Sequence, residues 1–307
     1  MSVPRFLVLL LAACFAAPLV AAPAGESAAQ TISVDPSRDA LLPTRTLDGR
    51  PHLLVKAALD GQPEGWWLVD TGAAGMRISA EYAAAAGLAD AGSVRAMAIG
   101  GASERRRWRG GALRLGQVTF HGLDYTEMPK LPGIEDVVGI IGTGAMSQAV
   151  FQFELVPGAP RVRVFARQSP PLARLPWKPV ALDPRQLVII DAMVEDKATG
   201  KFRMDLGAGT GLAMRAPFHE RHELREGREL TRRQVRGGGG PIDVDEGRLA
   251  KVEALGVSVA DLPALFLPEA TGMPDSGLDG EIGIKFFSGM TLWLDLGQSR
   301  MALQRSS

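Results

Sequence analysis

Short runs in which apolar and polar residues alternate fill most of the chain, and glycine or proline interrupts them. In the segments 52–58 and 187–193, for example, alternate side chains would share one face of a strand. Helix-like segments are short and few, the clearest being 80–88 and 216–224. The pattern therefore predicts an all-β protein with a few short helices.

The predicted elements occur twice and in the same order. In the first copy, strand 52–58 is followed by a turn and by a second strand that runs into Asp70-Thr71-Gly72. In the second copy, strand 187–193 is followed by a turn and by a strand that runs into Asp205-Leu206-Gly207. The two aspartates are 135 residues apart (205 − 70 = 135), close to half of the 307-residue chain.

Later landmarks repeat as well. Each half has a glycine-rich apex, Gly100–Gly101 and 237–240, and a later glycine-flanked strand, 139–142 and 280–283. Because an internal repeat of this length indicates two similar units, we expect a bilobal, duplicated fold. The expected boundaries are 44–167 and 183–307 for the two lobes, with a proline-containing linker at 168–182.

Asp70 and Asp205 each end an apolar strand, where aspartate is unusual because it is disfavoured in sheets and costly to bury unpaired. If the two lobes pack around a pseudo-twofold axis, the two carboxyl groups face each other. Two carboxyl groups that lie so close cannot both ionise readily, so they share a proton. One can then act as general base on a water molecule and the other as general acid toward a carbonyl oxygen.

The motif Asp70–Gly75, together with Ile140-Ile141-Gly142 later in the same half, resembles the bacterial retropepsin-like and pepsin-like aspartyl proteases. The resemblance extends over roughly residues 44–305. It implies a bilobal acid-protease barrel with two catalytic aspartates, Asp70 and, through the repeat, Asp205. It further implies supporting roles for Thr71, Gly72 and Gly207, and a glycine-tipped hairpin at Gly100 and Gly101 that closes over the substrate.

The resemblance also implies an activity. It predicts an aspartic-type endopeptidase that hydrolyses peptide or protein substrates and needs neither a metal nor an organic cofactor. A monomer suffices, because each half supplies one aspartate. His219 and His222 are three residues apart in the helix-like segment 216–224 and lack the usual spacing of metal ligands, so we interpret them as part of a solvated helix face.

Two residues depart from the family pattern. Leu206 stands where a threonine or serine is expected, and Glu281 stands where the first half has Ile140. Either change leaves open a catalytically inactive, protease-like protein that binds peptides or other ligands. Read alone, the glycine-rich segment 204–211 is also similar to the first motif of S-adenosylmethionine-dependent methyltransferases. That hypothesis is weaker, because no strand ending in an acidic residue follows about 20 residues later.

The first residues and the overall charge concern location and partners. Residues 1–24 have a charged start, an apolar run and small residues at the end, which predicts a bacterial signal peptide followed by a polar leader at 25–43. We therefore expect a periplasmic or secreted protein without an integral membrane span in its mature chain. A lipid anchor on Cys14, the single cysteine, is less favoured because the apolar run continues beyond it. Lys+Arg 34 balance Asp+Glu 34, so the charge gives no sign of a nucleic-acid partner.

Overall fold

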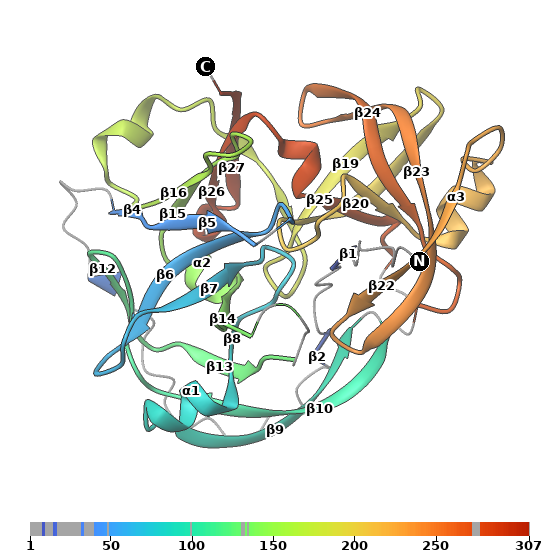
Figure 1. The fold of residues 1–307 in the computed structure, drawn as a ribbon. Coiled ribbons are helices and arrows are strands. Elements are labelled where there is room, and N and C mark those ends of the chain that lie inside the picture. The colour runs from blue at the N-terminus through green and yellow to red at the C-terminus, as the bar shows by residue number, and fades with distance from the viewer. Residues whose placement is uncertain are drawn as a thin grey trace.

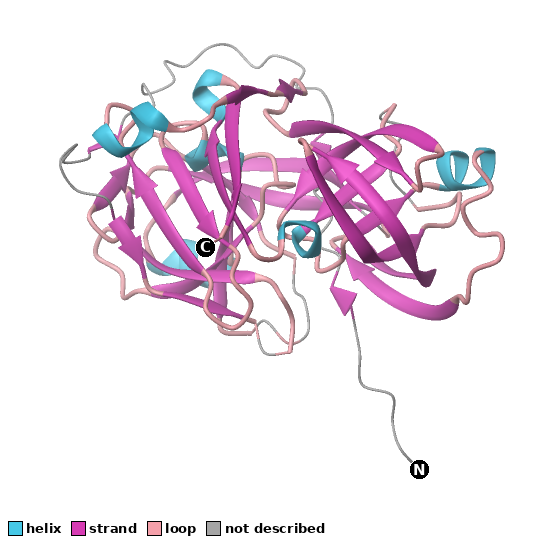
Figure 2. Ribbon diagram, turned by 90° about the horizontal axis from the view of Figure 1, so that it is seen from above, coloured by secondary structure: helices cyan, strands magenta, loops and turns pink. Residues whose placement is uncertain are grey.

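A computed structural model describes residues 8–9, 15–16, 32–33, 40–47, 49–98, 100–129, 133, 135–271 and 277–306. Strands dominate these residues, and Figure 1 shows two lobes side by side, the first half of the chain in blue to green and the second in yellow to orange. The prediction of an all-β, two-lobed protein is confirmed. Helices are short and lie around the strands, as Figure 2 shows.

The first lobe is built on a 12-stranded sheet. At its centre, β14 runs parallel to β7 and antiparallel to β8, and β8 runs parallel to β13. In sheet order the strands are β2 (Phe15–Ala16), β9 (Ala89–Ala98), β10 (Gly101–Arg109), β13 (Asp124–Glu127), β8 (Met76–Ile78), β14 (Val137–Ile141), β7 (Gly65–Val69), β6 (Leu53–Leu59), β11 (Leu113–Leu115), β12 (Val118–Phe120) and β3 (Ile32–Ser33), with β5 (Thr44–Thr46) paired to β6.

The second lobe is built on a 9-stranded sheet with the same central arrangement. Here β25 runs parallel to β20 and antiparallel to β21, and β21 runs parallel to β24. The repeat in the sequence is thus a repeat in topology. In sheet order the strands are β1 (Val8–Leu9), β22 (Thr231–Gly237), β23 (Gly240–Ala254), β24 (Val257–Phe266), β21 (Leu212–Met214), β25 (Gly280–Gly283), β20 (Ala198–Asp205), β19 (Val188–Val194) and β18 (Ala181–Leu182).

A third, six-stranded sheet joins the two halves of the chain. The closing strand of one repeat pairs with that of the other, and buried Phe151 and Phe153 lie opposite Leu294 and Leu292. Its strands are β17 (Lys178–Pro179), β27 (Arg300–Arg305), β26 (Met290–Asp295), β15 (Val150–Glu154), β16 (Arg161–Phe165) and β4 (Ala40–Leu42). The segments expected as linker and leader therefore each contribute a strand to this sheet.

Three α-helices and three 3-10 helices complete the described part of the chain. They are α1 (Ala80–Ala85), α2 (Thr143–Met146), α3 (Ala216–Arg221), η1 (Pro170–Arg174), η2 (Ile284–Phe287) and η3 (Leu296–Gln298). The first and third α-helices begin where the sequence predicts helices and end before residues 88 and 224. His219 on α3 is buried, with Nε2 3.0 Å from the Leu267 oxygen, so our interpretation of a solvated face is wrong for this residue. The helix packs against the lobe core on that side.

The predictions for the leader fall mostly outside the described residues. Within 1–24 the structure describes only β1, which pairs with β22, and β2, which pairs with β9. Cys14 is not among the described residues, and the signal peptide and the location stay predictions. Among the described residues, no helix is both long enough and apolar enough to span a membrane.

The sheet of the first lobe uses its two faces differently. Val69 and Ile141 point into the main core, whereas Leu68 and Ile140 belong to a separate apolar cluster. Because successive side chains of a strand alternate between faces, Asp70 projects from the same face as Leu68. We call this side of each lobe the dyad face.

Candidate active site

The structure brings Asp70 and Asp205 together. Asp70 directly follows β7, Asp205 ends β20, and both side chains are completely buried. A methyl group added to Gly72 would overlap the carboxyl group of Asp205, and one added to Gly207 would overlap the carboxyl group of Asp70. Each carboxyl group therefore packs against the glycine of the opposite motif, a position where only glycine leaves enough room.

The two carboxyl groups share one electrostatic environment. Burial raises the pKa of both, because a charge in the interior loses its hydration. The charge of Asp70 raises the pKa of Asp205 further, whereas the charges of Arg77 and Arg203 lower the pKa of Asp70. The pair therefore holds a proton above the ordinary aspartate range, and Asp205 is the stronger candidate to carry it.

The dyad keeps acceptor atoms available. The backbone N–H of Gly72 donates to Oδ1 of Asp70 at 2.8 Å, which fixes that carboxyl group in its loop. Apart from the proton that the two carboxyl groups share and the Gly207 N–H close to Asp205, no described donor serves Oδ2 of Asp70 or the carboxyl oxygens of Asp205. A buried acceptor without a partner is costly, so this arrangement suits a site that binds a water molecule or a substrate carbonyl group.

Thr71 bridges the two lobes. Its Oγ1 accepts a hydrogen bond from the backbone N–H of Leu206 at 2.9 Å and donates one to the Met204 carbonyl at 3.2 Å. Leu206 cannot return such a bond, and its side chain is instead completely buried in the main core. One hydroxyl group and one apolar contact thus hold the two motifs together.

Substitution of Thr71 by valine should destabilise the fold. The change keeps the shape but leaves the Leu206 N–H and the Met204 carbonyl buried without their partner, at about 1–3 kcal/mol each. We expect the free energy of unfolding in urea to fall by about 2–6 kcal/mol, the sum for the two groups. Thr71→Ser retains the hydroxyl group and is the matched control; equal losses for both variants would contradict the bridging role.

The raised pKa of Asp205 predicts a pH-dependent stability. Its ordinary pKa is 3.8, so the stabilisation from its bound proton is complete below that pH and is lost as the pH rises through the higher folded-state pKa. Asparagine does not titrate. The melting temperature of Asp205→Asn minus that of the wild type should therefore increase between pH 4 and pH 7.5. Thermal unfolding across this range tests the prediction, and a constant difference would contradict it.

The glycine-rich apices meet each other. Gly100 and Gly101 form the tip of the β9–β10 hairpin, and Gly239 and Gly240 form the tip of the β22–β23 hairpin. Methyl groups on Gly100 or Gly239 would overlap the backbone of the opposite tip. Figure 1 shows both hairpins extending toward each other below the lobes. Both repeats therefore supply a hairpin, and the two tips close on one another.

The second hairpin also covers its own dyad face. Val235 and Val244 of β22 and β23 pack in one cluster with Ala208 and Ala213, which lie beside the Asp205 motif. This packing places the second hairpin against the residues that follow the Asp205 motif. Since both carboxyl groups are completely buried, we expect that the hairpins separate before a peptide reaches them.

A hydrogen bond from Arg105 joins the two hairpins. The guanidinium group donates to the Gly238 carbonyl of the opposite hairpin at 2.9 Å. Arg105→Met should therefore speed hydrogen exchange of the amides around both tips, by about tenfold if the bond contributes at the lower end of charged hydrogen bonds. Arg106→Met is the control, because Arg106 pairs with Asp90 of its own hairpin. Unchanged exchange in the Arg105 variant would show that this bond does not hold the hairpins closed.

Sequence reasoning missed two buried arginines on the dyad faces, Arg77 of β8 and Arg203 of β20, each 2% exposed. Arg203 forms a buried ion pair with Glu281 on the neighbouring β25, which explains the carboxylate that departs from the family pattern. A signal existed: each arginine interrupts an otherwise apolar strand, Met76-Arg77-Ile78 and Phe202-Arg203-Met204.

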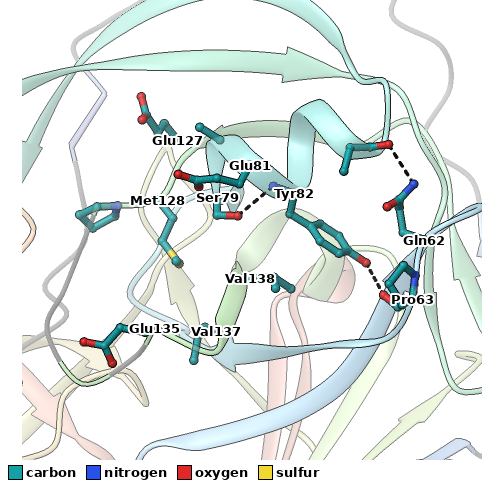
Figure 3. Close-up of a pocket in the computed structure, with 13 residues that line it drawn as sticks. Gln62, Pro63, Ser79, Glu81, Tyr82, Glu127, Met128, Glu135, Val137 and Val138 are labelled. Atoms are coloured by element: carbon teal, nitrogen blue, oxygen red, sulfur yellow. Dashed lines mark hydrogen bonds between the residues drawn. The ribbon is translucent and has the colours of Figure 1, made fainter.

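A cavity of about 780 Å³ lies beside α1 (Figure 3). Tyr82 and Gln62 lie on one side of it, and their side chains donate to the carbonyls of Pro63 and Ala85. Met128 and Val137 line it and also belong to the cluster that contains Leu68 and Ile140. This cavity borders the first lobe but contains neither aspartate.

Comparisons with known proteins agree with this geometry. A family model described as aspartyl protease matches residues 55–145 and 190–286, the segments that carry the two motifs. An aspartic proteinase from Irpex lacteus matches with a TM-score of 0.55 at 11% identity, over 88% of this chain and 98% of that chain. Basic 7S globulin from soybean matches with a TM-score of 0.53 at 9% identity, over 89% and 96%. The search of curated proteins gave no match.

Proposed function

The chain belongs to the aspartyl protease family, and from this premise we propose that it is an aspartic-type endopeptidase. The observation that carries the proposal is the juxtaposition of two completely buried aspartates, one from each repeat, each packed against the glycine of the other motif. Two carboxyl groups in such a position are suited to general acid and general base catalysis.

In the proposed reaction, Asp70 acts as the base and Asp205 as the acid. The ionised carboxylate of Asp70 takes a proton from a water molecule, whose oxygen attacks the carbonyl carbon of the peptide bond. Asp205 gives its proton to the carbonyl oxygen, and a tetrahedral gem-diol forms. The C–N bond then breaks as the amide nitrogen accepts the proton held by Asp70 and a gem-diol hydroxyl returns one to Asp205. The charge of Arg77 lowers the pKa of Asp70, and the charge of Asp70 raises the pKa of Asp205, which supports this division of roles.

The methyltransferase hypothesis does not fit the fold. The glycine-rich segment after Asp205 leads into β21 of a β-sheet lobe, whereas a cofactor-binding glycine motif needs a strand, a helix and a parallel strand. The activity assay described next distinguishes the peptidase from an inactive peptide-binding protein.

The test is hydrolysis of an unfolded protein between pH 3 and pH 8, with and without a statine-type inhibitor, whose hydroxyl group imitates the tetrahedral intermediate. We expect cleavage within the chain of the substrate that one equivalent of inhibitor abolishes. Tight binding of the inhibitor without cleavage at any pH would instead identify a binding protein. Cleavage that the inhibitor leaves unchanged would also overturn the proposal.

A further inference from the structure

Arg77 is a buried cation that forms no ion pair with a described residue, although its charge lowers the pKa of Asp70. Its side chain is 2% exposed, and Nη2 is buried without a hydrogen-bond acceptor. No ion pair joins Arg77 to any described carboxylate. A buried charge without a partner costs several kcal/mol, so a protein that retains one has a use for it.

The pairing of strands places Arg77 in a row of side chains on the dyad face of the first lobe. Leu68 of β7 lies opposite Ile140 of β14, Ile140 opposite Arg77, Arg77 opposite Thr126 of β13, and Thr126 opposite Arg107 of β10. Residues that lie opposite each other in adjacent strands share one face of a sheet. This row therefore begins beside Asp70, two residues after Leu68, and ends on the first hairpin.

The second lobe has an equivalent row of different charge. There Arg203 lies opposite Glu281, Glu281 opposite Ala213, Ala213 opposite Leu265, and Leu265 opposite Glu246. The row carries one arginine and two glutamates (1 − 2 = −1). The row of the first lobe carries two arginines and no acid (+2). Arg107 also pairs with Asp124 at 3.7 Å, Glu246 pairs with Arg233, and Arg203 pairs with Glu281. Among the charged residues of the two rows, Arg77 is therefore the one without an ion pair to a described residue.

We propose that Arg77 is a specificity-determining residue that binds a carboxylate of the substrate, so that the enzyme cleaves near an aspartate or glutamate. This inference rests on the proposed peptidase function. The bound carboxylate supplies the counterion that Glu281 supplies to Arg203 in the other lobe. A guanidinium group suits this role because it binds a carboxylate through two parallel hydrogen bonds.

The distance between Arg77 and the dyad limits which residue of the substrate can carry the recognised carboxylate. Arg77 is two strands away from Leu68, about 10 Å at the usual strand spacing, and an extended peptide advances about 3.3 Å per residue. The carboxylate therefore belongs within about three residues of the scissile bond. A side-chain carboxylate and the C-terminal carboxylate of a short peptide share the required chemistry, and amidated peptides distinguish them.

The experiment compares peptides that differ only in one side chain, which ends in a carboxylate or in a carboxamide. Cleavage sites are mapped in an unfolded protein, and synthetic amidated peptides around one site then carry glutamate or glutamine at each of the three positions on either side. For the wild type we expect kcat/KM to be about tenfold or more higher with glutamate at one position, mainly through KM. For Arg77→Met the two peptides should be cleaved equally well.

Arg114→Met is the control, because Arg114 lies on β11 and is 47% exposed beside Glu64. It should retain the preference of the wild type, and thermal unfolding verifies that both variants are folded. Equal cleavage of the two peptides by the wild type would overturn the inference, as would a preference that survives in Arg77→Met. A change confined to kcat and its pH profile would assign Arg77 to the dyad instead.

A failure of the proposed function is recognised separately. If the wild type cleaves no peptide, fluorescence anisotropy measures the binding of the same glutamate and glutamine peptides to Arg77→Met and the wild type. Tighter binding of the glutamate peptide to the wild type alone would support the subsite without a peptidase. Equal binding of both peptides to both proteins would reject the subsite as well.

Discussion

Asp70→Asn and Asp205→Asn are each expected to lower kcat by about 10³-fold or more. General acid and general base catalysis each contribute about 10²–10⁴-fold, and in a dyad the loss of one carboxyl group disables both roles. Asparagine is nearly isosteric with aspartate and keeps the packing against the opposite glycine. The loss should therefore appear in kcat, while the affinity for a non-cleaved peptide stays within a few-fold of the wild type.

Asp191→Asn is the matched control for the dyad variants. Asp191 lies on β19 of the second lobe, 70% exposed, and its only described side-chain partner is Lys201 at 3.2 Å. Its substitution should leave cleavage of an unfolded protein unchanged. Activity of either dyad variant within tenfold of the wild type, with the inhibitor still effective, would remove that carboxyl group from the mechanism.

The sequence predicted those features that local patterns determine. The repeat of strand, Asp-x-Gly and short helix placed Asp70 and Asp205 at equivalent points, and the structure brings them together across the lobes. The family resemblance implies a supporting role for Thr71, and in the structure its hydroxyl group bonds to the backbone at Leu206 and Met204. These contacts follow from the pseudo-twofold relation, which a repeat makes visible without coordinates.

Long-range pairing was beyond the sequence patterns. β4 and β17 lie in segments that were expected as leader and linker, and they gain hydrogen bonds only because β16 and β27 offer free edges. The contact between Gly100 and Gly240 depends on how far two hairpins extend. The sequence of one hairpin does not determine whether its tip reaches the tip of the hairpin in the other lobe.

The buried charges show why a departure from a repeat deserves a structural explanation. Glu281 at the position of Ile140 suggested a defect when each residue was considered alone. In the structure it is the counterion of Arg203, which itself replaces Leu68 of the first repeat. The two departures therefore form one compensated change, whereas Arg77, at the position of Ala213, has no such partner among the described residues.

Glu281→Ile should destabilise the protein by about 3–5 kcal/mol. The change removes one partner of a buried ion pair and leaves the guanidinium group of Arg203 charged in the interior. The shape of isoleucine is compatible with this position, because Ile140 occupies the equivalent place in the first lobe. The loss, measured as the free energy of unfolding in urea, would therefore report the removal of the ion pair with Arg203.

The double variant Arg203→Leu with Glu281→Ile is the decisive comparison. It gives the second lobe the apolar pair that Leu68 and Ile140 form in the first lobe, where both side chains are completely buried. Replacing a complete buried ion pair by apolar residues is often neutral or stabilising, so stability should return to the wild-type value or above it. A double variant as unstable as Glu281→Ile would show that the polar pair itself is required. Since Arg203 lowers the pKa of both aspartates, the acidic limb of the activity profile should also move to higher pH in the double variant.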